Sequence, residues 1–77
     1  MLPVTKMKAQ PELKLTPRET EIVRLIWEEL TTMEIAAQLG ISPRTVEAHR
    51  WNIAKKLGAK SSVGIVKFAL KAGIIQL

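Results

Sequence analysis

The segment 43–57 carries side chains that could contact nucleic acid. Helical spacing of about 100° per residue brings a mixed set of them to one side. These side chains are Arg44, Ala48, Trp51 and Lys55, with Glu47 and Asn52 at the flanks. Cations can contact phosphates, whereas carboxylate and amide groups can bond base edges and a small apolar side chain can touch a thymine methyl group. Such a mixture is unusual for a surface that is only solvated.

Individual roles follow from this side-chain chemistry. Glu47 is a candidate acceptor for a cytosine amino group, and Ala48 is a candidate contact for a thymine methyl group. Arg44, Lys55 and Lys56 are candidates for phosphate contacts. Roles unrelated to DNA stay open for these residues. Glu47 could be a first-turn acid favoured by the helix dipole, and the basic side chains could serve only solubility.

The same segment holds no convincing catalytic or metal site. The one histidine of the chain, His49, is near Glu47 and Asn52, but the three fall on different sides of one helix. Cysteine is absent, which excludes disulfides and thiolate ligands. A chain of 77 residues buries only about 60% of its unfolded surface, which leaves no room for a deep pocket. We therefore expect no enzyme activity, cofactor, metal ion or small-molecule substrate.

Basic residues gather in the C-terminal half of the chain. The net charge is +5, yet residues 1–40 carry five basic and six acidic groups, whereas residues 41–77 carry seven basic groups and one acidic group. A one-signed field on a small domain attracts polyanions such as nucleic acid or an anionic membrane. No apolar run approaches the roughly 20 residues of a membrane span, and a signal peptide's apolar region is missing at the start. We expect a cytoplasmic protein.

The elements that position the mixed face begin after an N-terminal arm. Residues 1–14 contain two prolines and no sustained apolar period, which predicts a flexible linker, with one domain over residues 15–77. Thr16 and Glu19 form a capping box around Pro17. The first helix is therefore predicted over residues 17–29.

Two helices separated by a tight turn follow. Thr31 and Glu34 form a second capping box, and the short helix that they open is expected to close at Gly40 in the left-handed conformation. Ser42 then caps the helix at 43–57. Two helices joined through so short a turn make a helix-turn-helix, whose second helix enters the DNA major groove.

The helix at 43–57 is expected to bury the side opposite its mixed face. Val46, Ile53 and Leu57 lie close to one line on the helical wheel, so we predict that they face the core. Trp51 projects from the other side. It is expected either to contact the groove or to pack against a neighbouring residue.

The last expected helix, 62–72, is apolar on two nearly opposite sides. One stripe consists of Val63, Val66 and Leu70, and the other of Ile65, Phe68, Ala69 and Ala72. Because a small domain offers one core, we expect self-association to cover the second stripe. The alternative is that Ile74, Ile75 and Leu77 fold back over it. The predicted fold is an all-α, four-helix, bundle-like domain.

Several spaced blocks together resemble the LuxR/NarL-type (GerE-like) helix-turn-helix over residues 15 to about 75. The blocks are LTPRE at 15–19, MEIAAQLGIS at 33–42, TVEAHR at 45–50, NI at 52–53 and KLG at 56–58. The resemblance implies the DNA-binding part of a bacterial transcription regulator, usually C-terminal to a phosphorylatable receiver or a sensor domain. This chain contains no aspartate, so it cannot itself hold a receiver's phosphoacceptor.

The resemblance also implies roles for single residues. Positions presented to the groove match Glu47, Ala48 and Trp51, with Asn52 nearby, and positions near the phosphate backbone match Arg44, Thr45, His49 and Lys56. The family's last helix is a dimer contact, which corresponds here to Val63, Val66, Lys67 and Leu70. Trp51 and Glu47 depart from the commoner residue types, so the target sequence cannot be transferred from a relative.

Sequence-specific binding of duplex DNA by a transcription regulator is the predicted function. A homodimer, formed on DNA and reading half-sites about 10 bp apart or a multiple of that, would supply the specificity that one helix lacks. One alternative is the promoter-reading domain of a sigma factor, which shares the architecture. Another is a protein-interaction adaptor that heterodimerises through the last helix without binding DNA. A basic membrane-surface helix is a weaker third, because the caps and turns specify a compact fold.

Overall fold

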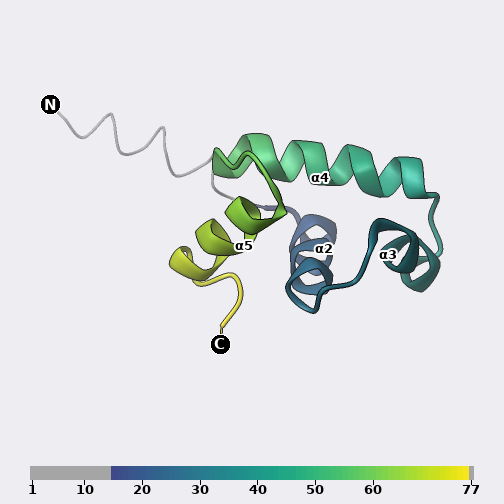
Figure 1. Ribbon diagram of the computed structural model, residues 1–77, viewed down its shortest axis with the longest axis horizontal. Helices are drawn as coiled ribbons and strands as arrows, with labels where there is room; N and C mark the ends of the chain where they lie inside the picture. Colours follow the sequence, from purple (N-terminus) through teal and green to yellow (C-terminus); the bar gives the residue numbers. More distant parts are fainter. Residues whose placement is uncertain (1–14, 77) are drawn as a thin grey trace, which may run out of the picture.

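The computed structural model describes residues 15–76, which form four α-helices and no strand (Figure 1). The helices are α2 (Pro17–Trp27), α3 (Thr32–Leu39), α4 (Pro43–Leu57) and α5 (Ser62–Lys71). The predicted all-α fold is confirmed. The predicted arm at 1–14 and the C-terminal Leu77 lie outside the described residues.

Both predicted capping boxes are present. The Thr16 hydroxyl accepts a hydrogen bond from the Glu19 backbone N–H at 3.1 Å, and the Glu19 carboxylate accepts one from the Thr16 N–H at 2.9 Å. Thr31 and Glu34 repeat the arrangement at the start of α3, at 3.1 and 2.8 Å. Each box satisfies backbone donors that have no partner inside the helix, which is why α2 and α3 start where the sequence predicts.

The end of α2 differs from the prediction. The helix stops at Trp27, and Glu29 adopts a left-handed conformation with φ of 66°. Backbone bonds from Glu29 N to Ile26 O (2.9 Å) and from Leu30 N to Leu25 O (3.1 Å) close the helix as a Schellman motif. Glycine usually marks this motif, and here a glutamate holds the position. The predicted end at residue 29 was therefore wrong by two residues.

The turn between α3 and α4 has the predicted geometry. Gly40 is left-handed with φ of 70°, and the Ile41 N–H donates to Ala36 O at 3.1 Å. Ile41 packs half-buried against the core, and the hydroxyl of Ser42 caps α4. A residue with a Cβ is disfavoured at a φ of this sign, so glycine is what allows the chain to reverse within so few residues.

Helix α4 lies along one edge of the molecule, with α3, α2 and α5 all on the same side of it (Figure 1). The largest fully buried side chains are Ile22, Val23, Ile35, Val46 and Ile53, from α2, α3 and α4. Leu57 is 4% exposed, so the predicted core side of α4 is confirmed. Among the four helices described, α2, α3 and α5 cover one side of α4, and none of them covers the opposite side.

Helix α5 buries only a narrow strip. Ile65 and Ala69 face the core, whereas Phe68 and Ala72, which share their predicted stripe, are exposed. On the other predicted stripe Val63 is 68% exposed. Val66 and Leu70 are half-buried at the edge of the core. The buried core contacts of α5 therefore come from Ile65 and Ala69, with Val66 and Leu70 packing against the core from the side.

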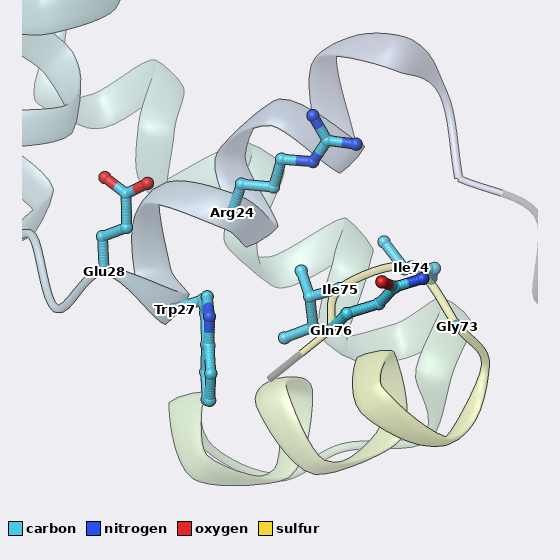
Figure 2. A pocket seen from close by; sticks show the side chains of 7 residues that line it. All are labelled: Arg24, Trp27, Glu28, Gly73, Ile74, Ile75 and Gln76. Atoms are coloured by element: carbon cyan, nitrogen blue, oxygen red, sulfur yellow. The ribbon is translucent and has the colours of Figure 1, made fainter.

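The segment after α5 turns back toward α2. Ile75 is buried in the core, and together with Trp27 it borders a shallow hollow between α2 and this segment (Figure 2). Of the residues expected in the alternative to fold back over α5, Ile75 is buried, and the Ile74 N–H donates to Ala69 O at 2.9 Å. Val63 nevertheless stays exposed, and Leu77 lies outside the described residues.

Candidate nucleic-acid interface

The predicted outer face of α4 is open to solvent. Its exposed side chains are Arg44, Glu47, Ala48, Trp51, Asn52 and Lys55. Trp51 is 62% exposed, which is uncommon for an indole in a small domain and excludes packing into the protein's own core. We call these six residues the α4 outer face.

Trp51 and Lys55 form one unit on this face. The Lys55 Nζ lies 4.3 Å from the centre of the Trp51 ring, within the range of a cation–π contact. The residues are one helical turn apart, so the helix itself places the ammonium group over the ring. The pair therefore presents a flat apolar surface and a positive charge side by side.

The start of α4 concentrates hydrogen-bond donors. The Ser42 hydroxyl accepts from the Thr45 N–H at 3.1 Å, and the hydroxyls of Ser42 and Thr45 lie 2.9 Å apart. Arg44 is exposed beside them. The N-terminal end of a helix carries partial positive charge, so Arg44 adds a full charge where an anion is already favoured.

Glu47 is held by a neighbouring helix. Its Oε2 accepts a hydrogen bond of 2.6 Å from the hydroxyl of Thr32, at the start of α3. Glu47 is the fifth residue of α4, and no acidic residue occupies the first turn of that helix. The alternative interpretation of Glu47 as a first-turn acid is therefore wrong. Sequence reasoning missed Thr32, because nothing in the spacing pairs residues 32 and 47.

Lys56 is engaged inside the domain. Its Nζ donates to the Glu19 Oε1 at 2.7 Å, joining the last turn of α4 to the first turn of α2. Burial would raise the pKa of the Glu19 carboxyl, but the hydrogen bond and charge of Lys56 and the bonds from Thr16 together lower that pKa below its ordinary value. The phosphate contact predicted for Lys56 stays a prediction, and Lys56 would have to leave Glu19 to make it.

Arg50 joins α4 to α5 at the edge of the α4 outer face. Its guanidinium donates to the hydroxyl of Ser62, the first residue of α5. Lys60 and Ser61 line the same hollow as Trp51 and Arg50. The sequence analysis did not assign Lys60, Ser61 or Ser62 to the interface. The N-cap Ser61, which follows the turn at residues 58–60, is the signal that could have identified them. His49 lies half-buried on the flank of α4.

The described part of the chain shows neither a cluster of potential metal ligands nor a membrane-spanning helix. No group of three or more histidine, cysteine, aspartate or glutamate side chains there could hold a metal ion. The hollow beside α2 has a single arginine and a single glutamate in its lining, and Figure 2 shows both directed away from Trp27. None of the helices in residues 15–76 is long and apolar enough to span a membrane.

The family model described as "Bacterial regulatory proteins, luxR family" matches residues 13–69 of the chain. Among curated proteins, the chain is 46% identical over 62 residues to the transcriptional regulatory protein MctR of Rhizobium johnstonii, covering 80% of this chain and 29% of MctR. It is 48% identical over 64 residues to the uncharacterized response regulatory protein YgeK of Escherichia coli, covering 83% of this chain and 44% of YgeK.

Two further similarities agree with these. The oxygen regulatory protein NreC of Staphylococcus aureus is 40% identical over 72 residues, covering 94% of this chain and 33% of NreC. The crystal structure of the response regulator ChrA of a heme-sensing two-component system superposes with a TM-score of 0.78 at 32% identity, covering 80% of this chain and 31% of ChrA. The chain thus spans less than half the length of each of these relatives.

Proposed function

The chain belongs to the luxR family of bacterial regulatory proteins, and on this basis we propose that it binds duplex DNA through the α4 outer face as part of a transcription regulator. The observation that carries the proposal is the exposure of that face, with Trp51 62% exposed and none of the other helices in residues 15–76 packed over it. Being a regulator of this type, it would act in the cytoplasm, where bacterial DNA lies, and would catalyse no reaction.

Base contacts fall to the residues near the middle of the face. Glu47 can accept from an amino group, Ala48 can touch a thymine methyl group, and Asn52 can both donate and accept. Trp51 supplies apolar contact against the groove wall. All four are exposed on adjacent turns of one helix, so one insertion of α4 into the major groove would bring them to neighbouring base pairs.

Phosphate contacts fall to the residues that border these four. Arg44 and Thr45 lie at the start of α4, Lys55 and Lys56 near its end, and His49 on its flank. Cations at both ends would grip the backbone on either side of the groove. Lys55 is the better placed of the two lysines, because Lys56 is bonded to Glu19.

Dimerisation would come from α5. Val63 and Lys67 are exposed, with Val66 and Leu70 half-buried beside them. Val63, Val66 and Lys67 also border an apolar hollow with Ile26 and Trp27 of α2. An exposed apolar surface of this kind is typical of a contact between protein copies. Two copies joined at α5 would present two α4 helices to two half-sites.

A further domain is part of the proposal. The chain covers 29% to 44% of MctR, YgeK and NreC, so these relatives contain about as much again or more. YgeK and ChrA are described as response regulators. We propose that a receiver or sensor domain acts upstream of this DNA-binding part, in the same chain or in a partner.

Selection of bound duplexes from a randomised pool tests the proposal. We expect enrichment of one motif with two related halves, and a footprint on a duplex that carries it. Recovery of random sequences, with no footprint, would contradict DNA reading by α4. If the chain instead forms a heterodimer with a regulator and leaves no footprint, the adaptor alternative replaces the proposal.

A further inference from the structure

We infer that Thr32 of α3 is a positioning residue for base reading: its hydroxyl holds the Glu47 carboxylate so that the free oxygen selects cytosine. The inference rests on the proposed function, because it concerns how the α4 outer face reads DNA. It assigns a role to a helix that otherwise only packs behind α4.

The contact that carries this inference joins two helices. The Thr32 hydroxyl donates to the Glu47 Oε2 at 2.6 Å, a short bond of the kind that an ionised acceptor makes. The residues are 15 positions apart in the chain. Because Glu47 is exposed, this bond does not bury a polar group that needs a partner for folding. Its effect must therefore be sought in the orientation of the side chain.

Thr32 is itself held in place. It is the first residue of α3, directly after the N-cap Thr31. The capping box between Thr31 and Glu34, with bonds of 3.1 and 2.8 Å, fixes the backbone at this point. The side chain of Thr32 is half-buried and β-branched, so it has few rotamers to choose from. The Thr32 hydroxyl is therefore a conformationally restricted donor, and it bonds the carboxylate of the more flexible Glu47 side chain.

An unrestrained glutamate is a poor reader of bases. Its three rotatable bonds leave it many orientations on an exposed surface, and fixing them on binding costs free energy. A hydrogen bond present before binding removes part of that cost, which is the usual benefit of preorganisation. The tether also decides which oxygen meets the DNA, because Oε2 is occupied and Oε1 stays free.

The free oxygen accepts hydrogen bonds but cannot donate them. In the major groove, cytosine offers its amino group, whereas guanine and thymine offer acceptors that repel a carboxylate. Adenine offers an amino group beside its N7 acceptor, which also repels the charge. Cytosine is therefore the base that a fixed Glu47 carboxylate accepts best.

The test compares substitutions on the motif selected by the wild-type protein. Thr32→Val keeps the shape and removes the hydroxyl, and Thr32→Ser keeps the hydroxyl. Met33→Leu, at a neighbouring residue that is 68% exposed, serves as the matched control. Binding is measured to the selected duplex and to duplexes in which each cytosine is replaced in turn, and thermal unfolding is followed for every variant.

We expect Thr32→Val to lower the preference for one cytosine by about fivefold or more, while Thr32→Ser and Met33→Leu keep it. In a Glu47→Ala background, Thr32→Val should cause no further change, because the residue that it positions is gone. Affinity for random duplexes and the unfolding temperature should stay close to those of the wild type.

Three results would overturn the inference. They are an unchanged preference in Thr32→Val, an equal loss of affinity for all duplexes, and an effect of Thr32→Val that persists without Glu47. These outcomes leave the proposed function standing, because the wild type still binds its motif. A wild-type protein that binds no duplex would overturn the proposed function, and this inference with it.

Discussion

Single residues of the α4 outer face differ in what they contribute to binding. Arg44 is exposed at the start of α4, where a phosphate contact would depend on charge and not on base identity. Helical spacing predicted the exposure of this residue and of Trp51, because the side of a helix that faces solvent follows from the period alone. The side-chain bonds between helices, Thr32 to Glu47, Lys56 to Glu19 and Arg50 to Ser62, could not be predicted, since each depends on how whole helices pack.

Arg44→Ala should weaken binding to specific and random duplexes by the same factor. The slope of log K against the logarithm of the salt concentration should also become shallower by about one, which is the contribution of one phosphate contact. Arg24→Ala is the matched control, because Arg24 is also exposed but lies on α2, away from α4. Fluorescence anisotropy over a range of salt concentrations measures both quantities. A loss confined to the specific duplex, or an equal loss in Arg24→Ala, would remove the phosphate role.

Helix ends and the contacts between helices determine how rigidly α4 is presented. Caps and glycines predicted nearly every boundary, because these residues satisfy terminal backbone groups by local geometry. The end of α2 was missed, since Glu29 holds a left-handed position that its residue type does not indicate. The role of α5 was only partly predictable, because two apolar stripes cannot reveal which one the core will bury.

Glu29→Gly should stabilise the domain by about 0.5–1 kcal/mol. Glycine adopts a φ of this sign without the steric cost that a side chain brings, although it is also freer in the unfolded chain. Glu29 is exposed, so the change removes little packing. Urea unfolding followed by circular dichroism gives the free energy of unfolding. A destabilised variant would mean that the glutamate side chain makes a favourable contact that outweighs the backbone cost.

Glu19→Gln should destabilise the domain by about 1.5–3 kcal/mol at neutral pH, the usual range for a hydrogen bond to a charged group. Glutamine can keep the capping bond but lacks the charge that attracts Lys56. Since folding lowers the pKa of Glu19, its stabilisation is complete above the ordinary value of 4.5 and is lost as the pH falls through the lower folded pKa. Unfolding curves at several pH values should therefore converge for wild type and variant in acid. A constant difference at all pH values would contradict this account.

Acidic and basic residues are unevenly distributed over the helices of the molecule. Apart from Glu47 on α4, the exposed glutamates lie on α2, α3 and the turn after α2, whereas the lysines of residues 41–77 lie on α4, α5 and the turn between them. This division is readable from the sequence, because all but one of the acidic groups lie in residues 1–40. The position of a second copy cannot be predicted from one sequence. The exposed surface of α5 indicates where a partner could bind but does not define how the two copies are arranged.

Bivalent binding should appear in the spacing of half-sites. Duplexes with two half-sites about 10 bp apart, or a multiple of that, should bind far more tightly than those with the spacing changed by half a turn. Val63→Glu should abolish that advantage while leaving binding to a single half-site unchanged, because Val63 is 68% exposed on α5 and is not part of the α4 outer face. Sedimentation of the complexes gives the number of copies bound. Equal affinity at all spacings would argue for a monomer.

An NMR titration of the protein with its selected duplex tests the central claim most directly, because it reports on every backbone amide and on the Trp51 indole. We predict that the largest shifts fall on the α4 outer face, including the Trp51 indole, with smaller shifts on α5 and none in the hollow lined by Arg24, Glu28 and the segment after α5. Shifts concentrated on α2 or the C-terminal segment, with the Trp51 indole unchanged on saturation, would contradict insertion of α4 into the groove.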